Sequence, residues 1–426
     1  MSALLSGCPS ETCPEGGTGT VVVNFSGLPA GATGTVVALG PTEETLTAPR
    51  TLEGAGGGAW GVTAEKVTAA DPRVRTAYAP TVSPASFCLA DGQTQTVEVA
   101  WAPIATSNKV WATNGNGSGQ LLGFASSVLA ATSTQAATVV INTGAGKDVA
   151  FDKDGNLWAL GPTTADPQVV RYAASSLGSS GTRTRDRGFS VAGLNCLPAL
   201  TGLAFDPEGN LWLSSPCRNA VMKISAEQLA STAAEVTPAV TLSEIPSAAG
   251  LAFDSAGNLW VASADSDRLV RFDPAQQSVS GATPALRLAP RISDDPANNG
   301  LYRPGWLAFD AAGDLWANDF GGNVFFRIPS TELTGTGDRQ VNPPVRLTVS
   351  VAALIEGLAF DEGGGLWTAF SSGKMARLDP SQLTTSTTGG APTVPQTVIT
   401  SGDIGSVGNV ALYPAPASSP LYHRLP

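Results

Sequence analysis

Histidine is nearly absent from this chain of 426 residues, since the single histidine is His423. A catalytic scheme that needs two histidines is therefore excluded. Most zinc and copper sites are excluded as well, because imidazole is a principal ligand of both metals.

Charged residues and long apolar runs are also scarce. Only 14% of the residues are charged, against about 25% in an average globular protein. Acidic residues outnumber basic ones by 35 to 24, and the net charge of −11 would repel a phosphate backbone, so nucleic acid is not an expected partner. No stretch reaches the roughly 18 apolar residues that span a bilayer. The 48 glycines and 31 prolines indicate many turns instead.

Five cysteines are present, and the first of them has an informative neighbourhood. Leu5-Ser6-Gly7-Cys8 resembles a bacterial lipobox, in which small residues precede a cysteine that is cleaved and acylated. The resemblance implies that Cys8 carries a lipid anchor and that residues 1–15 form a tether. No basic segment precedes this motif, and a chance match is the alternative.

The other four cysteines can pair in three ways. Pairing within the expected domains gives Cys13–Cys88 and Cys196–Cys217. Disulfides form in oxidising compartments outside the cytoplasm. We therefore expect an exported lipoprotein of the outer membrane or cell surface, or a periplasmic one.

Residues 16–104 are predicted to form a small β-sandwich. Short runs of strand composition alternate with clusters of glycine and proline, and no helical periodicity is present. The expected strands are 19–25, 34–39, 58–63, 76–81 and 96–101. The Gly-Leu-Pro-Ala-Gly and Ala-Trp-Gly-Val-Thr segments resemble prealbumin-like modules of bacterial surface lipoproteins, an Ig-like architecture. We expect Trp60 and Trp101 in its core.

Residues 108–426 repeat the unit Gly-Leu-Ala-Phe-Asp-x-x-Gly-Asn-Leu-Trp, most fully at 202–212 and 250–260. Including Trp111, successive tryptophans of the series are 47 to 56 residues apart. The series is Trp111, Trp158, Trp212, Trp260, Trp316 and Trp367. An all-β repeat of about 40–50 residues is typical of a propeller with four strands per blade. Leu-Ala-Phe would be the innermost strand, Asp-x-x-Gly-Asn a tight turn, and the indole a wedge between blades.

The ends of this region are complementary parts of one blade. The region begins at a second strand, Val110-Trp111, and ends with a first strand, 408–413. The fold class predicted is therefore all-β: a six-bladed β-propeller closed by its N- and C-terminal parts, preceded by the small β-sandwich domain.

The repeat resembles NHL-type, streptogramin-lyase-like and gluconolactonase-type propellers. Gluconolactonase-type enzymes hold a divalent metal at the axis, and the matching positions here include only two carboxylates, Glu356 and Asp148. The resemblance thus implies at most a weak structural cation there, and no other cofactor. Streptogramin lyases act through histidine, which the five complete units lack.

The turn Asp152-Lys-Asp-Gly-Asn156 resembles the start of a calcium loop. Its second carboxylate is absent from three of the five copies, and the glutamate expected at loop position twelve is absent from all five. A plain tight turn is the better interpretation.

One face of the propeller is the predicted binding surface, because the loops that enter each first strand share it with the loops that follow each second strand. The candidate ligand-binding residues are Asp148, Arg218, Asp265, Asn318, Asp319 and Glu356. No catalytic residue is predicted. We expect a monomeric, non-catalytic, surface-anchored protein that binds a protein, peptide or glycan or acts as a scaffold. The alternative is a metal-dependent lactonase- or lyase-like hydrolase with a divergent axial site.

Overall fold

The computed structural model divides the chain into two compact units, residues 1–105 and 106–426. The residues it describes are 13–28, 31–65, 67–68, 77–103, 109–114, 119–125, 131–143, 146–152, 154–161, 168–291, 303–319, 324–351, 353–361, 364–387, 391–404 and 407–413. Cys8, His423 and most of the insertion between Arg291 and Arg303 lie outside these ranges.

The first unit is a sandwich of two sheets, with strand orders β4-β1-β9-β7-β6 and β3-β2-β5-β8. Its strands are β1 (Thr18–Ser26), β2 (Val36–Leu39), β3 (Glu43–Leu46), β4 (Arg50–Gly56), β5 (Gly58–Ala64), β6 (Val67–Thr68), β7 (Ala77–Ser83), β8 (Ser86–Leu89) and β9 (Thr94–Pro103). Alternate residues of both sheets point into one core that includes Trp60 and Trp101, which are 2% and 3% exposed. The predicted disulfide Cys13–Cys88 joins the segment before β1 to β8.

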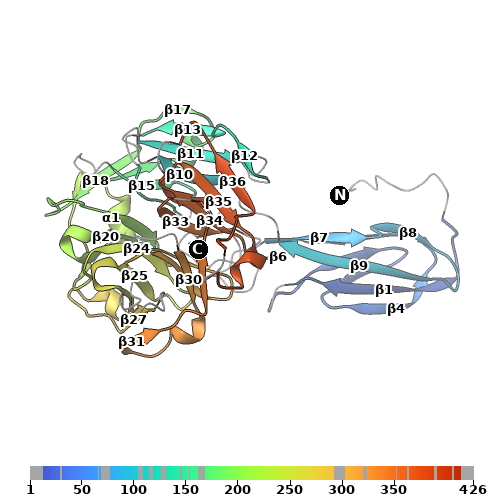
Figure 1. Ribbon diagram of the computed structural model, residues 1–426. Coiled ribbons are helices and arrows are strands. Elements are labelled where there is room, and N and C mark those ends of the chain that lie inside the picture. The colour runs from blue at the N-terminus through green and yellow to red at the C-terminus, as the bar shows by residue number, and fades with distance from the viewer. Residues whose placement is uncertain are drawn as a thin grey trace. The chain divides into compact units, whose positions relative to one another are not determined.

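Within the described residues, the second unit consists of six sheets of four or five strands, and four antiparallel strands of each sheet form one blade of a propeller (Figure 1). The first blade in chain order contains β14 (Val149–Phe151), β15 (Leu157–Leu160), β16 (Val169–Tyr172) and β18 (Arg187–Val191), and the second contains β19 (Gly202–Phe205), β20 (Leu211–Ser215), β21 (Ala220–Ile224) and β23 (Val240–Leu242). The third contains β24 (Ala248–Phe253), β25 (Leu259–Ser263), β26 (Arg268–Phe272) and β27 (Leu286–Pro290), and the fourth contains β28 (Pro304–Phe309), β29 (Leu315–Asp319), β30 (Val324–Ile328) and β32 (Val345–Thr348). The fifth contains β33 (Ile355–Phe360), β34 (Leu366–Phe370), β35 (Lys374–Leu378) and β36 (Thr397–Thr400).

The sixth blade combines the two ends of the unit, which confirms the predicted closure. The last strand, β37 (Val407–Tyr413), pairs antiparallel with β10 (Lys109–Asn114), and Trp111 faces Ala411 across the pair. The strands β11 (Gln120–Ala125) and β13 (Val139–Asn142) complete the sheet. The innermost strand of this blade therefore lies about 300 positions from its neighbour in sequence.

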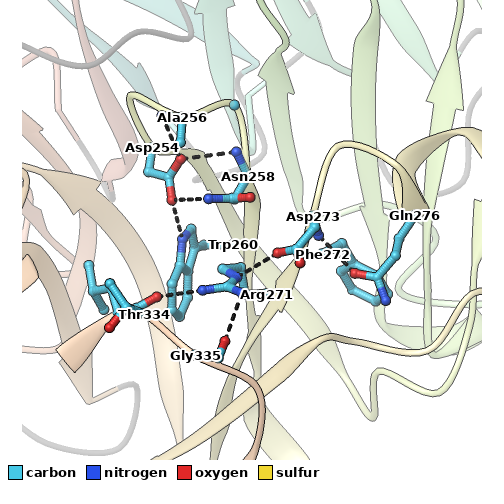
Figure 2. Close-up of polar contacts among 12 residues, drawn as sticks. Asp254, Ala256, Asn258, Trp260, Arg271, Phe272, Asp273, Gln276, Thr334 and Gly335 are labelled. Atoms are coloured by element: carbon cyan, nitrogen blue, oxygen red, sulfur yellow. Dashed lines mark hydrogen bonds and ion pairs between the residues drawn. The ribbon is translucent and has the colours of Figure 1, made fainter. Parts of the chain in front are cut away.

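The Asp-x-x-Gly-Asn turn shows why the repeat is conserved between blades (Figure 2). One carboxylate oxygen of Asp254 accepts from the backbone N–H groups of Ala256 and Asn258 at 2.9 and 3.0 Å. The other accepts from the side-chain amide of Asn258 and, at 3.0 Å, from the indole N–H of Trp260. Gly257 has a φ of 79°, which only glycine adopts easily. A single carboxylate thus closes the turn and orients the tryptophan.

Each oriented tryptophan lies between two blades, as predicted. Trp158 meets Phe205 of the next blade edge to face with ring centroids 6.1 Å apart, and Trp212 meets Phe253 in the same way. A cationic side chain from the neighbouring strand also lies over the indole ring, as Arg171 does over Trp158, 5.5 Å from the ring centroid. Aromatic burial of this kind contributes several kcal/mol per ring.

A further set of contacts, not predicted, covers the outer edge of each blade. The connection between the third and fourth strands of one blade reaches back to the outermost strand of the preceding blade. It adds short parallel strands: β12 (Ser133–Thr134) on β36, β17 (Gly181–Thr182) on β13, β22 (Glu235–Val236) on β18 and β31 (Gly337–Val341) on β27. In the two remaining blades, Gly281 donates to Thr241 and Thr393 bridges Val349. Cyan β12 beside red β36 is a second link between the ends of the ring (Figure 1).

Helical structure is confined to short segments. The described residues contain one α-helix, α1 (Ala226–Ala230), and several 3-10 turns, among them η3 (Pro216–Arg218) and η4 (Ala264–Ser266). Within the described part of the chain, no helix has the length and apolar character needed to cross a membrane.

Removal of β37 tests the closure. Deleting residues 407–426 strips β10 of its inner partner and leaves an unpaired edge, which lowers the melting temperature and promotes aggregation. Deleting only residues 414–426 keeps β37 and is the matched control. In differential scanning calorimetry the longer deletion should melt at a clearly lower temperature than the control. Light scattering should show more aggregation of the longer deletion. Equal melting temperatures would contradict the closure.

Asp254→Ala tests the turn. The variant leaves two backbone N–H groups and the indole N–H without their acceptor, and hydrogen bonds to charged groups contribute about 1.5–3 kcal/mol. We expect the free energy of unfolding, measured by urea titration, to fall by about 2–4 kcal/mol. Glu227→Ala, which removes an exposed carboxylate of α1, should change it by less than about 0.5 kcal/mol. Similar losses in the two variants would argue against this role of Asp254.

Candidate functional site

Strand direction gathers the predicted site residues on one face of the propeller. The register pairs the start of each innermost strand with the end of the second strand, as in Ala248 with Ser263 and Ile355 with Phe370. Residues at the first position and residues just after the second strand therefore share a face, which we call the entry face. It carries all six candidates: Asp148, Arg218, Asp265, Asn318, Asp319 and Glu356.

Side chains from all six innermost strands converge at the axis of the ring. They line a cavity of about 10 Å³, which is the lower limit for one water molecule. Its lining is Asp148, Val149, Leu203, Leu251, Trp306, Leu307, Leu358 and Asn409. This cavity is too small for an organic substrate.

Asp148 lies in this lining and is 3% exposed. One of its oxygens accepts from the backbone N–H of Val149 at 2.8 Å and from the side-chain amide of Asn409 in β37. The other accepts from the backbone N–H of Leu203 in the next blade at 2.8 Å. The carboxylate therefore links the closing blade to the two blades that follow it.

Burial raises the pKa of Asp148 to about 7, against the hydrogen bonds from Leu203, Asn409 and Val149, which lower it. Loss of hydration disfavours the charged form, and the donors recover only part of that cost. Near neutral pH this carboxyl group is therefore close to its titration midpoint.

Glu356 occupies the start of β33 and is half-buried. Burial raises its pKa to about 6, while the indole N–H of Trp306 and the positive charge of Lys147 lower it. That indole nitrogen is buried and has no hydrogen bond of good geometry. The pKa of Lys147 is lowered, because the effect of burial is larger than the opposing effect of the negative charge of Glu356. Glu356, Lys147 and Trp306 thus form a partly desolvated polar group on the entry face.

The two predicted metal ligands are differently placed. Both oxygens of Asp148 accept N–H donors, and neither Asp148 nor Glu356 is among the groups that shift the pKa of the other. Among the described residues no cluster of three or more metal-binding side chains occurs. A weak cation site at this pair stays a prediction.

Asn318 and Asp319 end β29 and are buried, at 0% and 1% exposure. The side chain of Asn318 accepts from the backbone N–H of Trp306 at 2.6 Å and donates to the carbonyl of Ile355 at 3.0 Å. It joins two neighbouring blades. Both residues are buried, and ligand contact by either of them stays a prediction.

The exposed part of the entry face carries the remaining candidates. Arg218 in η3 is exposed, and Asp265 in η4 forms an ion pair with Arg303 at 2.5 Å. The predicted disulfide Cys196–Cys217 connects the loop before β19 to η3, beside Arg218. The predicted lipidation site Cys8 lies outside the described residues.

Sequence reasoning missed Lys147, Trp306 and Asn409. Each lies within two positions of an innermost strand or inside one. Only the polarity of Asn409 in an otherwise apolar strand could have signalled its role. Each of the three also has a partner from another blade: Glu356 for Lys147 and Trp306, and Asp148 for Asn409.

No protein-family model matches the chain, and no curated protein is significantly similar to it. Solved structures are similar at low identity. A streptogramin B lyase is 14% identical over 56% of this chain and 66% of that one, with a TM-score of 0.39. A virginiamycin B lyase from Staphylococcus aureus is 11% identical over 56% of this chain and 68% of that one, with a TM-score of 0.39. A protein of unknown function from Bacteroides caccae is 10% identical over 69% of this chain and 98% of that one, with a TM-score of 0.44. The chain thus spans about two thirds of the lyases. The six-bladed propeller itself rests on the strand pairing.

The raised pKa of Asp148 predicts a pH dependence of stability. From about pH 4 to pH 7 the folded state keeps a proton that the unfolded state has lost, so the free energy of unfolding falls as pH rises and then levels off. The contribution is at most about 1.4 kcal/mol per pH unit.

Asp148→Asn removes this contribution. The variant should have a lower free energy of unfolding than wild type at every pH, because its amide NH₂ faces an N–H donor. The difference in free energy of unfolding between wild type and variant should shrink between pH 4.5 and 7 and then stay constant. Urea unfolding across this range measures it. Glu227→Gln is the control, and a pH-independent deficit for Asp148→Asn would contradict the prediction.

Proposed function

We propose that the entry face binds a protein, peptide or glycan ligand outside the cytoplasm, and that the protein is a non-catalytic binding or scaffold protein held at the cell surface through Cys8. The small volume of the described axial cavity is the observation that carries this proposal. A small substrate would need a concave site, whereas the described axial cavity holds about 10 Å³. Contact with a ligand would therefore be made by the loops of the face.

The loops have suitable chemistry for such contact. Two large apolar side chains stand exposed on this face: Leu197 in the disulfide-linked loop, at 61%, and Leu354 just before β33, at 43%. Arg218 and the Asp265–Arg303 pair add charge of both signs. Exposed apolar residues flanked by polar ones are characteristic of interaction surfaces.

The two disulfides support export to an oxidising compartment. They also hold loops that would otherwise lose entropy on binding, since Cys196–Cys217 restrains the segment that contains Leu197. Lipid attachment at Cys8 and a monomeric state complete the proposal.

A metal-dependent lactonase- or lyase-like hydrolase is the second candidate. The polar group around Glu356 favours it, because a carboxyl group whose pKa is raised by burial is a feature of catalytic sites. Lys147 beside it could stabilise an anion.

The test screens the whole protein on a glycan array and against a peptide library. The variant Leu197→Ala/Arg218→Ala/Leu354→Ala should lower the affinity for selected ligands at least tenfold. Val279→Ala/Val394→Ala is the matched control, since these side chains are 56% and 69% exposed but follow third strands, on the other face.

The same protein is assayed on a lactone panel with calcium, magnesium, manganese and zinc. Turnover that depends on metal and is lost in Glu356→Gln would overturn the proposal in favour of the hydrolase. Selected ligands that bind both triple and control variants like wild type would also overturn it.

A further inference from the structure

The opposite face of the propeller contains a larger pocket, of about 360 Å³, between the blades β14–β18 and β19–β23. Its floor is formed by Trp158 and Phe205, and α1 supplies a wall through Leu229 and Ala230. This volume lies within the range of small-ligand sites, about 300–1,000 Å³. The pocket is separate from the entry face, because the Asp-x-x-Gly turns that border it follow the far ends of the innermost strands.

The corresponding junction between the blades β24–β27 and β28–β32 shows how such a space is closed (Figure 2). There Arg271 donates to the carbonyls of Leu333 and Gly335, at 2.6 and 2.9 Å, and draws the next blade against Trp260. Arg171 has the same place above Trp158 but chelates Asp186 of its own blade instead. The bond to the next blade comes from Arg187 instead, which donates to the carbonyl of Ala233 at 2.7 Å, and Arg171 lines the pocket.

The wall of the pocket is held in place before any ligand arrives. Ser225 and Gln228 cap α1 reciprocally, and the backbone N–H of Ala226 donates to the side chain of Asn210 at 3.0 Å. The guanidinium of Arg171 is neutralised by Asp186. These contacts hold the floor and the wall in place. The charge of a bound ligand therefore depends on the charged side chains at the rim.

The rim carries two carboxylates at equivalent positions of neighbouring turns. Asp154 and Glu208 are both exposed and both line the pocket. The same position is Ala256, Ala312 and Gly363 in the other three copies of the repeat. The carboxylate that occurs in only two of the five turns thus occurs in the two turns that flank this pocket.

We propose that this pocket binds an organic cation with an apolar stem, the chemistry of a lysine side chain or an aliphatic amine. The stem would contact Phe205, Leu229 and Ala230, and the ammonium group would lie between Asp154 and Glu208, where opposite charges attract at the rim. A metal ion is disfavoured: the carboxylate of Asp152 already accepts from Asn156 and Trp158, and the described residues hold no cluster of three metal ligands.

Isothermal titration calorimetry of the whole protein at low salt tests the proposal. The probes are Nα-acetyl-lysine methylamide, 1,5-diaminopentane and the uncharged Nα-acetyl-norleucine methylamide. Either amine should bind at least tenfold more tightly than the norleucine compound. Preference for the lysine derivative indicates a peptide ligand, and preference for the diamine indicates a free amine.

Two variants with matched controls locate the binding. Glu208→Gln should weaken amine binding at least threefold, whereas Glu227→Gln, which removes a charge outside the pocket lining, should not. Ala230→Trp should fill the pocket and abolish binding, whereas Glu227→Trp on the same helix should not. Because these positions are exposed, the variants should melt like wild type. Equal affinity for the amines and the norleucine compound, no binding of either amine, or unchanged binding by Ala230→Trp would overturn the proposal.

Discussion

Closure of the ring is the constraint on which the propeller depends. Each blade has two apolar faces, and its tryptophan is buried against an apolar side chain of the next blade, such as Phe205 against Trp158 or Phe253 against Trp212. An open series of blades would leave two such faces in water at a cost of about 25 cal/mol per Å² of apolar surface. Pairing of β10 with β37 and of β12 with β36 removes both exposed ends.

Closure also decides what the axis can do. Six innermost strands converge there, and Asn409 of the last strand donates to Asp148 at the start of the first complete blade. The carboxylate of Asp148 thus holds the ring together. Its two oxygens accept hydrogen bonds from three blades. Glu356 and Lys147 lie on the same face, and the charge of each opposes the shift that burial causes in the pKa of the other.

Different positions of the repeated turn have different surroundings. Its first aspartate is used in every complete unit to orient the indole, as in Asp152 and Asp254. The third position varies between the copies, and the two copies that carry a carboxylate there, Asp154 and Glu208, both line the pocket between their blades. Departures from a repeat, rather than its shared residues, mark the sites at which one blade differs in function.

Local patterns in the sequence determined the all-β class, the blade unit, the complementary ends and the domain-wise disulfides, because hairpin hydrogen bonds and tight turns depend on neighbouring residues. The sequence also identified the face on which Arg218, Asp265 and Glu356 lie, since strand direction follows from the repeat. Only the tertiary structure decided which of these residues are exposed. Burial of Asn318 and Asp319, the coupling of Glu356 to Lys147, and the open junction beside α1 arise from contacts between blades tens to hundreds of residues apart, and no local pattern encodes such distances.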